Sequence, residues 1–242
     1  MSFDDKLYEG KYRYSKDRRT YSEETFTYAQ QIGQQRHILI TSEVLSRVKT
    51  GEFLKIHVTY EVTRGFDPVY AIITRQLGPK QSVEIYDIEL KTNTYRYSFK
   101  DFEGQVHSFE RVYSGKPHIA TPCFATSMFV VNQKKLDPVH RTRYNLLTSN
   151  NIWEFVEDPF EKDVFIEMVD VEQIKINVAG NDLKATHCKL LEMDENLNAK
   201  EKHDLYLSRH FSLPYKIDFV NGIEIDIEKL KHLQNNITLK LS

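Results

Sequence analysis

Apolar and polar residues alternate along the C-terminal part of the chain, from Asp182 to Ile227. The apolar positions fall into three runs: Leu205, Leu207 and Phe211; Tyr215, Ile217 and Phe219; and Ile223, Ile225 and Ile227. A period of two is typical of strands with one buried and one exposed face. Asn221-Gly222 separates the last two runs, and this dipeptide is a strong hairpin signal. The pattern therefore predicts an antiparallel meander.

The N-terminal half shows the same alternation. It is clearest in FLKIHVTYEVT, where Ile56, Val58, Tyr60 and Val62 alternate with polar residues. This pattern predicts a half-buried strand, and similar runs on either side predict successive hairpins. Residues 42–49 fit either a short helix or a continued strand. In SVEIYDIEL the apolar phase changes between residues 85 and 88, which predicts a β-bulge.

The alternation stops between Lys116 and Asp137. Within this segment Phe124, Ser127, Met128 and Val131 follow helical spacing, so we expect the main helix here. Thr121 is the expected N-cap and Pro122 the first helical position. We expect this helix to cover one mouth or face of the sheet. The tail, residues 227–242, fits a strand or a short helix.

These elements together predict a mainly β protein. We expect residues 1–242 to form a single domain, an antiparallel meander curved into an open or closed barrel with one or two short helices. The architecture would be lipocalin-like or lipoprotein-carrier-like. A length of 242 residues is within the range of single-domain barrels.

Several stretches resemble those of the half-barrel lipoprotein carriers of the Lol type and of uncharacterised bacterial proteins with that architecture. They are YEGKYRY (residues 8–14), ATPCFATSMFVV in the middle, AGNDLKATHCKL (residues 179–190), and DLYLSRHFSLPYKIDFVNGIEIDI near the end. The resemblance implies a curved antiparallel sheet wrapped over helices, with an apolar concave face for acyl chains.

Composition narrows the possible functions. A net charge of −2 supplies no basic excess for nucleic-acid binding. The aromatic content, 14 Tyr, 14 Phe and 1 Trp, suits strands and also the lining of a ligand cavity. The start, MSFDDKLYEG, lacks the features of a signal peptide, and no apolar run approaches a membrane span. We therefore expect a cytoplasmic protein.

No motif identifies a reaction. The sequence has no GxSxG, HExxH, CxxC or glycine-rich phosphate loop, so no cofactor is expected. Its two cysteines, Cys123 and Cys188, cannot by themselves form a zinc site or a disulfide framework. Both are expected to be buried thiols, although Cys123, close to a helix start, is also a conceivable nucleophile with His118.

The remaining chemical signal is a set of polar residues that share a register with apolar ones: Arg75, Arg111, Arg209, His107 and His187. A charged group on an apolar face needs a carboxylate partner or an anionic ligand. Arginines in this position can also end in solvent. We expect Arg75, Arg111 and Arg209, with Tyr60, to bind the acidic head of an amphiphilic ligand, because arginine recognises carboxylate and phosphate bidentately.

Three functions follow from this pattern. The first is binding of a hydrophobic or amphiphilic small molecule, with an acidic head as one option, by a carrier or sensor. The second is a lyase, hydratase or isomerase acting on a lipid-like substrate, for which His107, His187 and Tyr97 are the candidate catalytic residues. The third is a structural or interaction domain with a filled core. An internal cavity would separate the first two from the third.

Overall fold

Strands make up most of the structure, a computed structural model that describes residues 5–30, 37–132, 135–193, 199–208, 213–233 and 237–240. The strands are β1 (Asp5–Lys16), β2 (Arg19–Gln30), β3 (Ile38–Arg47), β4 (Phe53–Val62), β5 (Pro68–Leu77), β6 (Lys80–Glu89), β7 (Thr94–Lys100), β8 (Val106–Val112), β9 (His118–Ile119), β10 (Thr142–Thr148), β11 (Phe160–Met168), β12 (Ile174–Val178), β13 (Asn181–Met193), β14 (Ala199–Leu207), β15 (Pro214–Asp218), β16 (Ile223–His232) and β17 (Ile237–Lys240). The helical elements are α1 (Phe124–Ser127) and the 3-10 helix η1 (Met128–Asn132).

The strands form one long sheet. From β8 back to β1, each strand pairs antiparallel with its neighbour in sequence. Strand β1 also pairs with β16, and the ladder continues through β15, β14, β13, β11 and β10. It ends at β9, which runs parallel to β10. Among the described strands β8 pairs with β7 and β9 pairs with β10, with no pairing between β8 and β9, so the barrel-like sheet is not closed.

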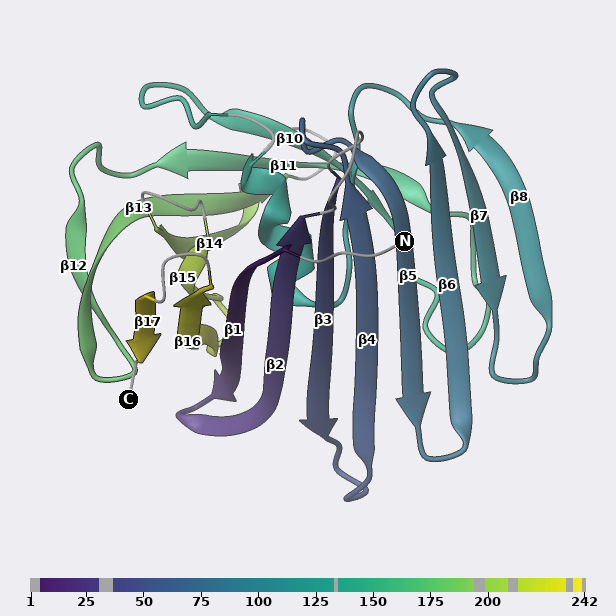
Figure 1. The fold of residues 1–242 in the computed structure, drawn as a ribbon, viewed down its shortest axis with the longest axis horizontal. Coiled ribbons are helices and arrows are strands. Elements are labelled where there is room, and N and C mark those ends of the chain that lie inside the picture. The colour runs from purple at the N-terminus through teal and green to yellow at the C-terminus, as the bar shows by residue number, and fades with distance from the viewer. Residues whose placement is uncertain are drawn as a thin grey trace.

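The second half of the sheet curls behind the first. In Figure 1, β10, β11 and β13 run across the direction of β1–β4, and the short helical segment lies between the two layers. Contacts between the layers hold this arrangement. The Tyr28 hydroxyl donates to the Ala125 carbonyl at 3.1 Å, and the Tyr12 hydroxyl donates to the Pro214 carbonyl at 2.8 Å. The inner face of β1–β8, which carries Tyr12 and Tyr28, therefore holds the core.

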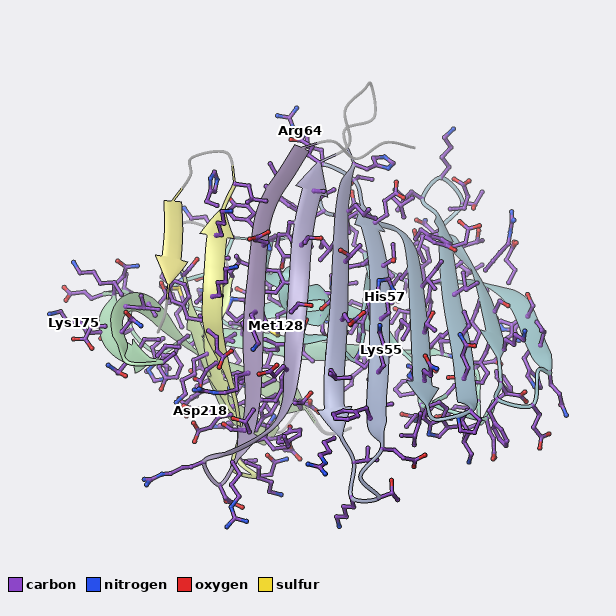
Figure 2. The ribbon with its side chains drawn as sticks, turned by 60° about the horizontal axis from the view of Figure 1, so that its bottom comes forward. Lys55, His57, Arg64, Met128, Lys175 and Asp218 are labelled. Carbon is purple, nitrogen blue, oxygen red and sulfur yellow. The ribbon has the colours of Figure 1, made fainter. Side chains whose placement is uncertain are left out.

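The outer face of the sheet is polar. Figure 2 looks onto this face, where Lys55 and His57 of β4 lie, whereas Met128 of η1 belongs to the buried core beneath the sheet. On the opposite, inner face of β4, Val58 and Tyr60 are fully buried. This alternation confirms the half-buried strand predicted for FLKIHVTYEVT and is the usual pattern of an antiparallel sheet with one covered face.

The meander and its last hairpin are confirmed. Ile217 of β15 faces Ile225 of β16, and both are buried. Gly222 has a φ of +79°, a conformation that glycine adopts without strain. Two segments fitted either a helix or a strand on their sequence. In the first, residues 42–47 belong to strand β3. In the second, the tail, the described residues belong to β16 and β17, apart from a turn at Leu233.

The bulge predicted between residues 85 and 88 is wrong. Strand β6 pairs with β5 and β7 without a register shift. Its inward positions are Ser82, Glu84, Tyr86 and Ile88, all buried. The apparent change of phase arises because a carboxylate and a hydroxyl take two positions that an apolar residue usually fills.

The main helix is present but shorter than its spacing predicts. It begins at Phe124, not at Pro122, and after one turn it tightens into η1. The Glu24 carboxylate of β2 accepts hydrogen bonds from the backbone N–H groups of Phe124 (2.8 Å) and Ala125 (2.9 Å). These bonds satisfy N–H groups that the start of a helix leaves free. No helix in the described part of the chain has the length and hydropathy needed to cross a membrane.

Candidate functional site

Two adjoining cavities lie between the layers. The first, here called the polar cavity, has a volume of about 540 Å³ and contains Arg75 and Glu84 among apolar side chains such as Leu54 and Leu77. The second, the apolar cavity, has a volume of about 580 Å³. Five residues line both: Ala120, Thr121, Pro122, Thr148 and Asn150. The segment between β9 and α1 and the end of β10 therefore form a shared wall.

Arg75 and Glu84 form an ion pair on the inner face of the β5–β6 hairpin. Arg75 is directly opposite Ser82, and Glu84 is the next inward residue along β6. Nη2 of Arg75 lies 2.8 Å from Oε2 of Glu84. The two side chains are 9% and 1% exposed, which makes this the most buried ion pair among the described residues.

Glu84 has further partners, but Arg75 has a free donor. The hydroxyls of Tyr86 (2.7 Å) and Tyr97 (3.2 Å) both donate to Oε1 of Glu84. In contrast, Nη1 of Arg75 is buried without a hydrogen-bond partner in the described structure. A buried donor without an acceptor costs free energy, so an acceptor that reached this atom would be stabilised.

Asn151 holds one wall of the polar cavity in place. Its Nδ2 donates to the Tyr97 hydroxyl and to the Glu157 carbonyl, both at 2.8 Å, and its Oδ1 accepts from the N–H groups of Val156 and Glu157. Burial raises the pKa of Tyr97, with the Glu84 carboxylate adding to this effect, so its hydroxyl remains a donor. The wall that includes Trp153 is thereby attached to the sheet.

The apolar cavity is lined mostly by core side chains. Its walls include Phe124, Met128, Leu146, Val164 and Phe219. Lys162 and Glu192 are the charged residues of its described lining, and their side chains form an ion pair at 2.5 Å. A cavity of this composition favours hydrocarbon.

A buried carboxylate network lies behind the wall of the apolar cavity. Glu24 is fully buried, and it accepts hydrogen bonds from the hydroxyls of Tyr14 and Ser42 as well as from α1. Burial raises its pKa, an effect that the four donors oppose. Burial and the nearby Glu24 also raise the pKa of the Cys123 thiol, which disfavours the thiolate that a nucleophile requires.

The predicted ligand-binding residues lie in different environments. Arg75 lines the polar cavity. Tyr60 is fully buried, and its hydroxyl contacts Nδ1 of His118 at 2.9 Å, which joins β4 to β9. The Arg111 side chain is 52% exposed, packs over Phe109 and pairs with Asp158. Arg209 lies outside the described residues.

The predicted catalytic residues are in separate networks. His107 stacks on Phe155 with ring centroids 4.3 Å apart, whereas the Tyr97 hydroxyl contacts Glu84. His187 pairs with Asp204 at 2.6 Å. The face of β13 that is buried changes between Ala185 and Cys188, where its partner changes from β12 to β11. None of the three candidates is among the described residues that line the two cavities.

Sequence reasoning missed Glu84 and Asn151. A signal for Glu84 exists, because counting across the expected turn at Gly78-Pro79 places it next to Arg75 on one face. Asn151 has no such signal, because its role depends on contacts with distant Tyr97. Among the described residues, no group of three or more His, Cys, Asp and Glu side chains could hold a metal ion.

Comparisons with known proteins extend only to the fold. No protein-family model and no curated protein matches the sequence. The similar solved structures include two crystal structures. A β-barrel-like protein of the domain of unknown function DUF1849 from Brucella abortus has a TM-score of 0.57 and 8% identity, with 96% of this chain and 99% of that chain covered. A DUF1089 family protein from Pseudomonas aeruginosa has a TM-score of 0.51 and 10% identity, with 84% and 91% covered. The chain therefore has a β-barrel-like fold that it shares with uncharacterised bacterial proteins.

Proposed function

We propose that this protein binds an amphiphilic small molecule, as a carrier or sensor, with the polar head at Arg75 and the hydrocarbon part in the apolar cavity. The observation that carries the proposal is the partnerless Nη1 of Arg75 in a cavity that shares a wall with an apolar one. Ligand sites usually combine apolar walls with a few polar groups that orient the ligand.

The size of the site supports this proposal. Each cavity, at about 540 and 580 Å³, falls within the range typical of small-molecule sites, roughly 300–1,000 Å³. The two cavities differ in chemistry, which suits a ligand that has a polar and an apolar end. A ligand spanning both would pass the shared wall at Ala120 and Thr148.

Binding without catalysis accounts for the arrangement better than an enzyme does. A general acid or base must come within hydrogen-bond reach of the bound substrate. His107 and His187 have their own partners away from the two cavities, and the Tyr97 hydroxyl contacts Glu84, Asn151 and Ser149 of the polar cavity but does not itself line it. The arrangement of these residues therefore supports reversible ligand binding rather than catalysis.

The test is native mass spectrometry of the purified protein, with extraction of any bound lipid, followed by titration with dodecyl amphiphiles. Trp153 is the single tryptophan of the chain and lines the polar cavity, so its fluorescence reports occupancy. We expect saturable binding by the wild type. Absence of both a co-purified molecule and a saturable response would overturn the proposal.

Two variants connect binding to these cavities. Ala120→Phe places a ring in the shared wall and is expected to abolish binding, whereas Val139→Phe, at a residue 79% exposed, is the matched control. Arg75→Lys keeps a cation beside Glu84 but removes the second terminal nitrogen of the guanidinium, the position of Nη1. It is expected to weaken binding about tenfold, the value of one charge-assisted hydrogen bond. Equal binding by Ala120→Phe and Val139→Phe would place the ligand elsewhere.

A further inference from the structure

Among the described residues, every charged side chain that lines the two cavities is already paired. In the polar cavity, Arg75 pairs with Glu84 at 2.8 Å. In the apolar cavity, Lys162 pairs with Glu192 at 2.5 Å. The described lining therefore has no net charge and no cation without a carboxylate. Behind it, the buried Glu24 carboxylate contacts Tyr14, a further lining residue.

The guanidinium of Arg75 is shared with a resident anion. Its Nη2 donates to Glu84, and its Nη1 has no hydrogen-bond partner among the described residues. A ligand carboxylate or phosphate at Nη1 would lie on the same guanidinium as Glu84, so the two anions would repel each other at short range in a site with little water. It would also bring a charge into the protein without a cation of its own.

An uncharged oxygen avoids both costs. A carbonyl, ester or hydroxyl oxygen accepts the Nη1 hydrogen bond and leaves the Arg75–Glu84 pair neutral. Because Glu84 already accepts from Tyr86 and Tyr97, it has less capacity to take a proton or a donor from the ligand. The charge balance thus distinguishes between two classes of amphiphile that share the same tail.

We propose that the site selects an amphiphile with an uncharged, oxygen-bearing head, such as an ester or alcohol of a fatty acyl chain, over one with a carboxylate or phosphate. This inference rests on the proposed binding function. It narrows the expectation from sequence, in which the arginines suggested an acidic head as one option.

The test compares three probes with one tail: monododecanoylglycerol, methyl dodecanoate and dodecanoate. Binding to the wild-type protein is followed by Trp153 fluorescence at about pH 8, where the free acid is ionised. We expect both esters to bind at least about tenfold more tightly than dodecanoate. Equal or tighter binding of dodecanoate overturns the inference but leaves the binding function in place. No binding of any probe overturns the binding function itself.

The Glu84→Gln variant tests the cause of the selectivity. It removes the resident negative charge while keeping a side chain of the same shape, so the preference for the esters is expected to fall about tenfold or to reverse. Glu192→Gln, in the apolar cavity, is the matched control and is expected to have a smaller effect. An unchanged preference in a folded Glu84→Gln protein contradicts the inference. If that variant fails to fold, the wild-type comparison of methyl dodecanoate with dodecanoate, which differ in head charge, decides the question alone.

Discussion

Arg75 and Glu84 lie diagonally across the β5–β6 hairpin, and both are buried on the inner face of the sheet. Their pairing has two consequences. It neutralises two charges that would otherwise be costly in the interior, and it fixes the guanidinium so that Nη1 remains free. The ion pair is therefore both a structural contact and the polar end of the proposed site.

Removing one partner of this pair is expected to cost far more than removing both. Arg75→Met or Glu84→Met alone leaves a buried charge without a partner, which costs about 3–5 kcal/mol. The double variant replaces both charges with apolar side chains, so its cost is expected to be well below the sum of the two. Urea unfolding of the four proteins measures the coupling. Additive losses would contradict this account, and Arg111→Met, at an exposed pair, provides the control.

Glu24 is expected to hold the helical segment through its acceptor oxygens. Glu24→Gln replaces one of these oxygens with an N–H₂ group that faces the donors Phe124 N–H and Ala125 N–H. We expect a loss of about 1–3 kcal/mol in the free energy of unfolding, the usual cost of an unsatisfied buried group. Glu23→Gln, one residue away but 52% exposed, is the matched control. Equal stability of Glu24→Gln and Glu23→Gln would show that the hydrogen bonds from Phe124 and Ala125 to Glu24 contribute nothing to stability.

Gly10 is expected to tolerate no side chain. A Cβ at this position in β1 would lie 2.2 Å from Cζ of Phe26 and 2.9 Å from the Lys229 carbonyl oxygen. Gly10→Ala should therefore destabilise the protein by about 1–3 kcal/mol through overpacking. Adding Phe26→Leu should recover part of the loss. Gly65→Ala is the control, because its nearest atom is 3.4 Å away, and a thermal melt of the variants compares them.

The strands were predictable because their signals are local. Alternation in β4 and the turn at Asn221-Gly222 depend on neighbouring residues, so the sequence alone is sufficient. The pairing of β1 with β16, such as Tyr12 with Ile227, joins opposite ends of the chain and has no local signal. The helix was predicted too long because its start is set by Glu24, a residue on a distant strand.

The site was only partly predictable for the same reason. Arg75 stood out because a charge occupies an apolar register, and that reasoning depends on periodicity alone. The same reasoning selected Arg111, which lies at the surface because β8 is an edge strand in the described sheet. Glu84 was missed because its polarity was interpreted as a bulge, although a carboxylate partner was one of the two options considered for Arg75. Periodicity shows which face a residue is on but not what covers that face.

The stability of the protein is expected to fall in mild acid because of His118. Burial lowers its pKa from 6.5 to about 4, and its ring contacts the Tyr60 hydroxyl and the Thr126 carbonyl. A lowered pKa means that the unfolded chain binds a proton first, so the contribution is fully present above about pH 6.5 and is lost as the pH falls toward 4. Between about pH 7 and pH 5 the loss is about 2 kcal/mol.

His118→Gln tests this prediction, because a glutamine amide can still donate to the Thr126 carbonyl but does not titrate. Urea unfolding at both pH values should show a smaller pH dependence in the variant than in the wild type. Glu24 acts in the opposite direction, since its raised pKa favours the native state as the pH falls, and it is the same in both proteins. His57→Gln, on the outer face of β4, shows the effect of removing a histidine without breaking the contact between β4 and β9. If His118→Gln keeps the full pH dependence of the wild-type stability, His118 is excluded as the cause of the acid destabilisation.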